Sequence, residues 1–114
     1  MQRDELYLED IIEACDYIAG FVEGVDFDDF SDSELIRSAV LEKLIVIGEA
    51  VSRLSGEFKD RHPEVEWPAI AGLRNRIVHG YFRIDWTIIW TAATEEAPSL
   101  RDQVARIIAE EFGG

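Results

Sequence analysis

Apolar residues recur at helical spacing through most of this chain, and no sustained run alternates between apolar and polar residues as a strand would. The broadest apolar surface lies on residues 31–55, where Ser31 and Glu34 form a capping box and Gly56 follows the end. A surface this broad is typical of helices buried on two sides, and we interpret it as core plus a contact between subunits. Gly48 costs this helix about 1 kcal/mol against alanine, so we expect it to permit the close approach of another helix.

Three more helices are predicted around this segment. One spans residues 4–22, and a second spans residues 68–79, from a proline in its first turn to Gly80, which can turn left-handed at its end. The last covers residues 85–112 and is expected to kink or restart near its middle, because Pro98 cannot donate the hydrogen bond of a regular helix. We therefore predict an all-α fold, an antiparallel bundle of four to five helices.

Two connecting segments separate these helices. Residues 24–30 form an acidic connector, and we expect its two phenylalanines to anchor it to the bundle. A calcium site at its three aspartates is a second interpretation, but the EF-hand ligand pattern is absent. Residues 61–63 are predicted to be a loop because Pro63 disfavours helical geometry at His62, which we interpret as a loop residue and not as a ligand contact.

The charge of the chain is unevenly distributed. At 114 residues it forms one domain, residues 1–114, with 24 acidic and 11 basic residues and a net charge of −13. Such acidity argues against indiscriminate binding to nucleic acids. Residues 53–83, however, contain six of the basic residues, four of the acidic ones and both histidines, a net charge of +2 that leaves −15 for the remainder. This distribution favours selective contact with RNA, or a partner that covers the less acidic patch.

Nothing in the sequence indicates a membrane or an oxidising compartment. No apolar run approaches the ~18 residues of a membrane span, and the N-terminus lacks the pattern of a signal peptide. We therefore expect a cytoplasmic protein. The single cysteine, Cys15, cannot form an internal disulfide and lies on the apolar stripe of the first helix, so we interpret it as a core residue and not as a reactive thiol.

The candidate site lies at the end of the 68–79 helix and just beyond it. Asn75 and His79 are four residues apart and share a helix face, whereas Arg74 lies about 140° from His79 but has a long side chain. Tyr81 follows the predicted end of the helix. This short segment therefore contains a permanent cation, an amide, an imidazole and a phenol.

These residue types suit the cleavage of RNA without a metal ion, which needs a base for the 2′-hydroxyl and an acid for the leaving 5′-oxygen. Histidine titrates near neutrality when unperturbed, so His79 is the candidate acid–base, and Arg74 is the candidate clamp for the scissile phosphate. Asn75 is expected to orient His79 or the phosphate, and Tyr81 to contact a phosphate oxygen or a base. On spacing alone, a plainer interpretation is favoured, in which His79 closes a helix C-terminus where its charge meets the dipole favourably.

Other residues near the segment have two interpretations each. Arg76 and Arg83 are candidate RNA contacts, with surface salt bridges as the alternative. The tryptophans are assigned to packing, although aromatic rings also stack on bases: they are Trp67, Trp86 and Trp90. Neither a phosphate-binding glycine loop, nor a serine or cysteine beside a base, nor a set of zinc ligands is present, so we predict no cofactor and no metal.

The string Arg74-x4-His79-x-Tyr81 resembles the motif of the HepT-like toxins, a branch of the HEPN superfamily of helical ribonucleases, and Asn75 matches the polar residue usual after its arginine. The resemblance spans essentially the whole chain. It includes Asp10 to Ala14, Ile47 to Ala50, Arg61 to Glu64, Trp67, Ile70 to Gly72 and Asp85. Glu42 and Lys43 depart from the pattern, since a basic residue and an asparagine would be expected there.

The resemblance implies a metal-independent endoribonuclease toxin of a type VII-like toxin–antitoxin pair. It also implies a homodimer with a composite cleft, which supplies two copies of His79, and a minimal nucleotidyltransferase partner that neutralises the toxin by attaching AMP to Tyr81. The alternative is a non-catalytic subunit that binds nucleotide or substrate for a two-chain nucleotidyltransferase. The acidity of the chain favours this alternative, and the intact motif favours the ribonuclease.

Overall fold

The computed structural model describes residues 3–113, and of Tyr81 it describes the backbone alone. Every regular element in this part of the chain is a helix, as predicted. The long elements are α1 (Arg3–Val22), α3 (Glu34–Arg53), α5 (Trp67–His79) and α7 (Ala97–Glu111). The shorter ones are α2 (Phe27–Asp32), α4 (Gly56–Arg61), the 3-10 turn η1 (Tyr81–Arg83), α6 (Trp86–Thr91) and the π-helical turn η2 (Ala92–Glu96). Within residues 3–113, none of the helices is both long and apolar enough to span a membrane.

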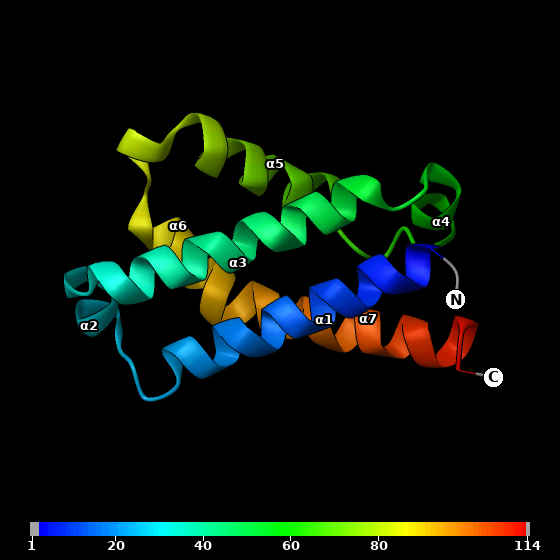
Figure 1. Ribbon diagram of the computed structural model, residues 1–114, viewed down its shortest axis with the longest axis horizontal. Helices are drawn as coiled ribbons and strands as arrows, with labels where there is room; N and C mark the ends of the chain where they lie inside the picture. The colour runs from blue at the N-terminus through cyan, green and yellow to red at the C-terminus, as the bar shows by residue number, and fades with distance from the viewer. Residues whose placement is uncertain (1–2, 114) are drawn as a thin grey trace.

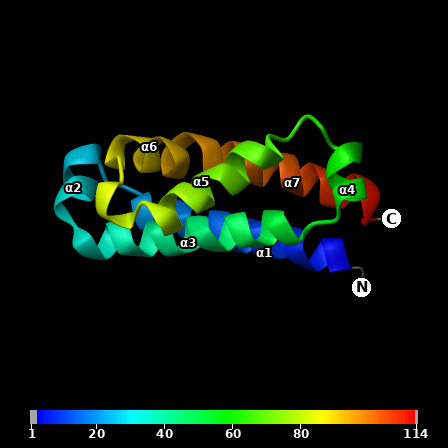
Figure 2. The same cartoon turned by 90° about the horizontal axis from the view of Figure 1, so that it is seen from above.

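Helix α3 lies at the centre of the arrangement. It packs between α1 and α5, and α7 packs against α1 (Figure 1). Seen from above, α5 runs between α3 and the α6–α7 side of the molecule (Figure 2). The broad apolar surface of α3 is therefore buried on two sides within one chain, and Val40, Ile47 and Val51 are at most 2% exposed. Packing on α1 and α5 buries most of this surface, but Leu35 in the first turn of α3 is 81% exposed. The contact between subunits stays a prediction.

The acidic connector contains a short helix, α2, that the apolar spacing did not predict. Asp26 caps it by accepting a hydrogen bond from the amide of Asp29 at 2.8 Å. Phe30 is fully buried against Trp86 and Trp90 and anchors the connector as expected. Phe27, the other expected anchor, is 37% exposed and meets the ring of Trp90, with ring centres 6.2 Å apart. The same contacts show that these two tryptophans are partly buried and pack against the core.

The start of α3 differs from the prediction. Its cap is Ser33, whose hydroxyl accepts a hydrogen bond from the amide of Ile36 at 3.1 Å. Ser31 belongs to α2 instead, because the preceding residues fold as a separate helix that buries Phe30. The predicted capping box with Glu34 therefore does not form.

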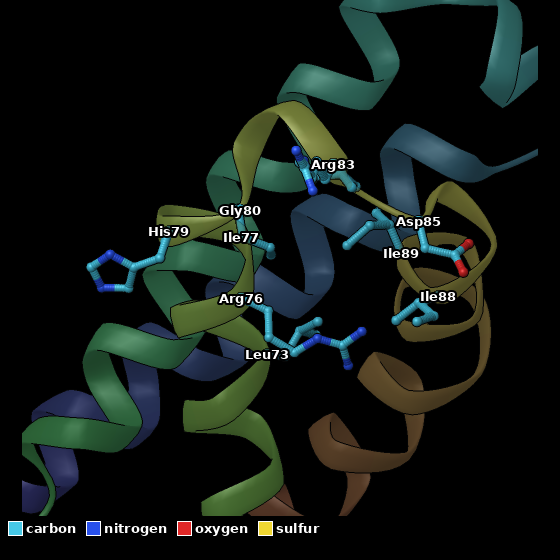
Figure 3. A pocket seen from close by; sticks show the side chains of 10 residues that line it. Leu73, Arg76, Ile77, His79, Gly80, Arg83, Asp85, Ile88 and Ile89 are labelled. Carbon is cyan, nitrogen blue, oxygen red and sulfur yellow. The ribbon is translucent and has the colours of Figure 1, made fainter.

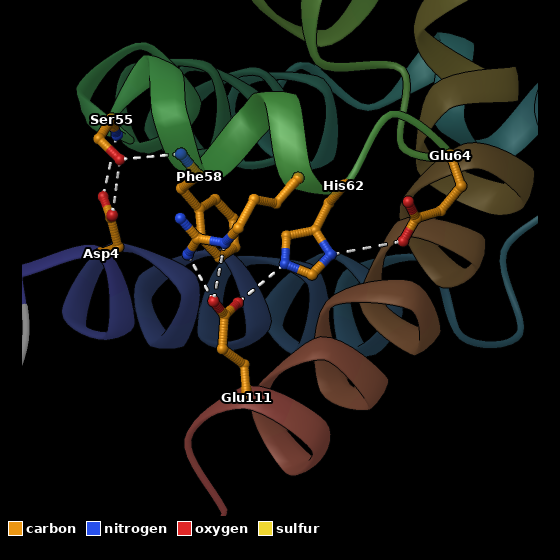
Figure 4. Close-up of polar contacts among 7 residues, drawn as sticks. Asp4, Ser55, Phe58, His62, Glu64 and Glu111 are labelled. Atoms are coloured by element: carbon orange, nitrogen blue, oxygen red, sulfur yellow. Dashed lines mark hydrogen bonds and ion pairs between the residues drawn. The ribbon is translucent and has the colours of Figure 1, made fainter.

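At the other end of α3, Gly56 begins the helix α4, which was not predicted. Ser55 caps α4 by accepting from the amide of Phe58 at 3.1 Å, and its own hydroxyl donates to Asp4 of α1 at 2.8 Å (Figure 4). Arg61 is the last residue of α4, so the predicted loop begins only at His62.

His62 makes structural contacts in this loop. Its ring packs 4.7 Å from that of Phe58, measured between ring centres, and its Nε2 lies 2.8 Å from a carboxylate oxygen of Glu111 (Figure 4). Arg61 donates to the same carboxylate from Nε at 3.1 Å. The indole N–H of Trp67 donates to the carbonyl of His62 at 3.0 Å, and Trp67 is only 4% exposed, which confirms its assignment to packing.

The last predicted helix is continuous from α6 through η2 to α7, with the irregularity where Pro98 was expected to cause one. Asp85 caps α6 by accepting from the amide of Thr87 at 3.0 Å. In η2 the amide of Ala97 bonds back to the carbonyl of Ala92, five residues earlier. This wider turn makes room for the proline ring, which would clash with the carbonyl of the preceding turn in a regular helix.

Cys15 is a core residue, as interpreted. It is 3% exposed, and burial, with a smaller contribution from the charge of Asp16, raises the pKa of its thiol to about 12. A thiol in this state is not a nucleophile at neutral pH.

Candidate active site

Arg74 is held in place by two adjacent residues of α3. A Cβ built on Gly48 would overlap the Cβ of Arg74 and come within 2.6 Å of its Cγ, so only glycine leaves room for this side chain. The close approach predicted at Gly48 is therefore confirmed, and its purpose is to admit Arg74. The guanidinium then reaches Glu49, with which its Nη2 forms a hydrogen-bonded ion pair.

The same guanidinium also contacts its neighbour in the chain. Nη1 of Arg74 donates to Oδ1 of Asn75 at 3.0 Å. Its Nε is buried and has no hydrogen-bond partner among the described residues. Arg74 is thus fixed from two sides, and the amide oxygen of Asn75 is occupied while its amide nitrogen makes no bond within the described part of the chain. Asn75 orients Arg74, and no hydrogen bond joins it to His79.

His79 is the last residue of α5 and is exposed. Figure 3 shows its ring pointing outward, away from Ile88 and Ile89. The ring makes no hydrogen bond or ion pair with any residue that the structure describes. Its position at the C-terminus of a helix is also the one that the plainer interpretation requires.

Arg76 and Arg83 line one hollow of about 290 Å³ at the end of α5, to which His79, Gly80 and Asp85 also contribute (Figure 3). Neither arginine forms an ion pair within residues 3–113, so the alternative of surface salt bridges does not hold there. Arg74 does not line this hollow. The structure therefore places Arg74 and Asn75 on the α3 side of α5 and the other two arginines on its α6 side.

Gly80 ends α5 in a manner that differs from the prediction. Its φ is −123°, which is not left-handed. Its amide donates to the carbonyl of Arg76 at 2.9 Å, and a Cβ would lie only 2.8 Å from that oxygen. Glycine is required here for close approach, because the chain passes directly into the 3-10 turn η1, where the amide of Arg83 bonds to the carbonyl of Gly80 at 2.8 Å.

The side chain of Tyr81 lies outside the described part of the structure. Its backbone begins η1 directly after Gly80 and two residues after His79. The expectations for its hydroxyl therefore stay predictions.

Glu49 is a site residue to which the sequence alone assigned no role. Its partner, Arg74, is 25 residues away in the chain, so no local pattern links them. The sequence signal that could have found Glu49 was its position directly after Gly48. A glycine at a close contact between two helices brings the next side chain near the same residue of the facing helix. By contrast, Glu42 and Lys43, which depart from the family pattern, pair with each other at 3.3 Å, and neither lines the hollow.

Comparisons with known proteins agree with the motif. A family model described as ribonuclease HepT-like matches residues 11–107. A relative in Caldanaerobacter subterraneus subsp. tengcongensis, a candidate RNase by its name, is 37% identical over 111 residues, which are 97% of this chain and 99% of that protein. "Probable ribonuclease HepT" of Thermococcus cleftensis is 36% identical over 101 residues, 89% of this chain and 92% of that one. No solved structure matches the chain significantly.

Proposed function

Because this chain belongs to the ribonuclease HepT-like family, we propose that it is an endoribonuclease that cuts RNA without a metal ion. The observation that carries this proposal is that the basic residues of the motif region differ in whether they have an acidic partner. Arg74 is fixed by Glu49 and Asn75, while His79, Arg76 and Arg83 have no acidic partner among the described residues. Such an end can receive the phosphates of RNA.

In the proposed reaction, His79 of one subunit takes the proton of a 2′-hydroxyl, and the oxygen attacks the neighbouring phosphorus. The bond from phosphorus to the 5′-oxygen breaks, and that oxygen leaves with a proton from an acid. The products are a 2′,3′-cyclic phosphate and a 5′-hydroxyl. Arg74 stabilises the negative charge that develops on the phosphoryl oxygens, and the free amide nitrogen of Asn75 adds a donor. Arg76 and Arg83 bind neighbouring phosphates.

The reaction requires an acid as well as a base, and one chain has one histidine at this site. We therefore propose a homodimer in which two α5 helices meet and the second His79 supplies the acid. Val78 supports a contact at this helix, because it is an apolar side chain beside the motif that is 42% exposed. Sedimentation at micromolar concentration should show a dimer, and a 13.0 kDa monomer alone would contradict this part of the proposal.

The proposed biological setting is a toxin neutralised by a minimal nucleotidyltransferase. The oxygen of Tyr81 would attack the α-phosphorus of ATP, form a phosphodiester with AMP and release pyrophosphate. The added phosphate puts negative charge on the residue that directly follows Gly80, and Gly80 lines the hollow where RNA phosphate is proposed to bind. Tyr81→Phe should keep much of the nuclease activity and escape neutralisation. The wild type expressed with the partner should gain about 329 Da for each AMP, and an unmodified Tyr81 in a neutralised complex would contradict this step.

The test of the nuclease is a cleavage assay on the purified protein, free of partner, with a synthetic RNA in excess EDTA. The expected result is cutting with 2′,3′-cyclic phosphate ends, identified by mass. Absence of cutting by well-folded protein, or ends that carry a 5′-phosphate, would contradict the proposed reaction. Binding of nucleotide without any cutting would favour the non-catalytic subunit, an alternative that the net charge of −13 supports.

A further inference from the structure

The hollow at the end of α5 continues into a larger one. A second hollow of about 680 Å³ lies between α5 and the η2–α7 segment. The two share Leu73, Arg76 and Ile88, so they form one groove along the side of α5 that faces away from Glu49. We call the larger part the α5–α7 groove. Its size falls in the range of sites that enclose small organic ligands.

The α5–α7 groove has an apolar floor and small side chains along its walls. Leu44 and Ile47 of α3 line it, as do three alanines, the exposed Ala69 and the buried Ala92 and Ala97. The π-helical turn η2 contributes to one wall, and such turns are frequent at functional sites. The groove can therefore contact the face of a flat apolar ring without a change in the core.

The rim of the α5–α7 groove presents mainly hydrogen-bond acceptors. Glu66 and Glu96 provide carboxylates, which form no ion pair or hydrogen bond within the described residues. Gln103 donates its amide nitrogen to the carbonyl of Glu64 at 3.3 Å, which leaves its amide oxygen as an acceptor. Among the described residues that line this groove, the sole cation is Arg76, at the boundary with the smaller hollow. The basic residues thus lie toward η1, at Arg76 and Arg83, and the acidic ones at Glu66, before α5, and Glu96, at the end of η2.

We propose that the α5–α7 groove is a subsite for one base of the RNA substrate, and that it selects bases that carry amino groups, guanine above all. This inference rests on the proposed ribonuclease function and adds to it a specificity site. A phosphate held by Arg76 and Arg83 places the attached nucleotide at the mouth of the groove. The carboxylates repel a second phosphate, so the part that enters is the uncharged base.

The acceptors on the rim explain the choice of base. Guanine has adjacent N1–H and N2–H donors, which match the two oxygens of one carboxylate. Adenine and cytosine have one amino group each. Uracil has a single N–H between two carbonyl oxygens, and these oxygens would face Glu66 or Glu96 without a donor. Leaving such polar groups unpaired lowers affinity strongly, so uracil is disfavoured.

The experiment measures the binding of GMP and UMP to the purified full chain by isothermal titration calorimetry at low salt. GMP should bind at least about tenfold more tightly than UMP, the ratio expected from one extra pair of hydrogen bonds. Ala69→Phe adds bulk at an exposed position on the wall and should weaken GMP at least about tenfold. Its control is Ala19→Phe, an exposed alanine of α1 outside the groove, which should bind GMP as the wild type does.

A second variant keeps the shape of the groove and changes only the acceptors. The double substitution Glu66→Gln and Glu96→Gln should bring the two affinities within about threefold of each other, while Glu110→Gln, exposed on α7 outside the groove, should leave their ratio unchanged. Equal affinity for GMP and UMP in the wild type, no binding of either, or no effect of Ala69→Phe would each overturn the base subsite.

The nuclease and the subsite can fail separately. If the protein selects GMP in the groove but does not cut RNA, the subsite proposal stands and the nuclease proposal is wrong. If the wild type cuts RNA with no preference for the base, and Ala69→Phe cuts it equally well, the nuclease proposal stands and the subsite proposal is wrong.

Discussion

The molecule has an arginine and a histidine at each of two places, and their surroundings are opposite. At the α4 end, Arg61 and His62 both contact Glu111, and the His62 ring also packs on Phe58. At the far end of α5, His79 has no such partner in the described structure and its ring points outward (Figure 3). The residue types are the same at both places, but at the α4 end a carboxylate and an aromatic ring hold the histidine, and at the end of α5 no described acid pairs with it.

The comparison shows how one set of side chains serves both stability and chemistry. Arg61 and His62 share the carboxylate of Glu111 and so hold α4 against α7. If either moved away, the carboxylate would lose a hydrogen-bond partner. Near the motif, Glu49 contacts Arg74, whereas His79 forms no ion pair with any residue that the structure describes. A general acid–base must exchange protons with a substrate, so it is the unpaired histidine that is suited to catalysis.

The largest expected effect is on the rate of RNA cleavage, when Arg74 at one end and Arg61 at the other are each replaced by alanine. Arg74→Ala should lower the rate of RNA cleavage at least about 100-fold, since it removes the clamp for the developing charge. Arg61→Ala should leave the rate within about threefold of the wild type and lower the melting temperature instead, because it removes a surface ion pair with Glu111 and a contact with the Phe58 ring. Rates are measured on one RNA, with circular dichroism to verify folding. Equal losses of activity would remove the distinction between the two ends.

A second test addresses the contact that places Arg74. Gly48→Ala should destabilise the protein by about 1–3 kcal/mol, because the new Cβ overlaps Arg74 and must displace α5. Gly20→Ala is the control, as a Cβ at this position of α1 meets nothing within 4 Å. It should gain up to about 1 kcal/mol from helix propensity. Urea unfolding measures both, and equal stability of the two variants would show that the contact is not tight.

A third test concerns the acid that orients Arg74. Glu49→Gln keeps the shape of the side chain but removes its charge, so Arg74 is held less firmly. We expect about a tenfold loss in kcat with little change in KM, as for a group that acts on orientation in the transition state. Glu42→Gln, on the same helix, should have no effect. A Glu49→Gln enzyme with the kcat of the wild type would show that Glu49 serves stability alone.

The smallest effect is expected at the paired end and depends on pH. Burial raises the pKa of the Glu111 carboxyl, but the hydrogen bonds and charges of His62 and Arg61 outweigh it, so this pKa lies below its usual value of 4.5. A lowered pKa in the folded state contributes stability above the unfolded pKa and loses it as the pH falls through the folded pKa. Glu111→Gln should therefore cost up to about 1 kcal/mol near pH 7, and this cost should shrink as the pH falls below 4.5 and through the lowered pKa of the folded state. A cost that does not change with pH would exclude the carboxylate charge as its source.

The long helices could be predicted from the sequence because each carries an apolar stripe over several turns. The short ones could not, since α2 and α4 are too brief for a stripe and depend on the caps Asp26 and Ser55. Ser31 and Ser33 both stand where a cap is plausible, and only the burial of Phe30 decides between them.

The candidate site could be predicted as a set of residues but not as an arrangement. Spacing along α5 places Asn75 and His79 on one face, yet the hydrogen bond of Asn75 goes to Arg74. That choice depends on Gly48 and Glu49, which belong to another helix and reach Arg74 only through the packing of α3 on α5. Side chains that meet across two helices leave no periodic signal in either.

The most direct test of the account compares the two histidines in one assay. His79→Ala and His62→Ala are each incubated with the same RNA in EDTA, and the initial rates are compared with that of the wild type. The account predicts that His79→Ala loses at least about 100-fold in rate at an unchanged melting temperature, the contribution typical of a general acid–base. It predicts that His62→Ala keeps the rate and melts at a lower temperature. Unchanged cleavage by His79→Ala, or an equal loss in His62→Ala, would contradict the assignment of catalysis to the unpaired histidine.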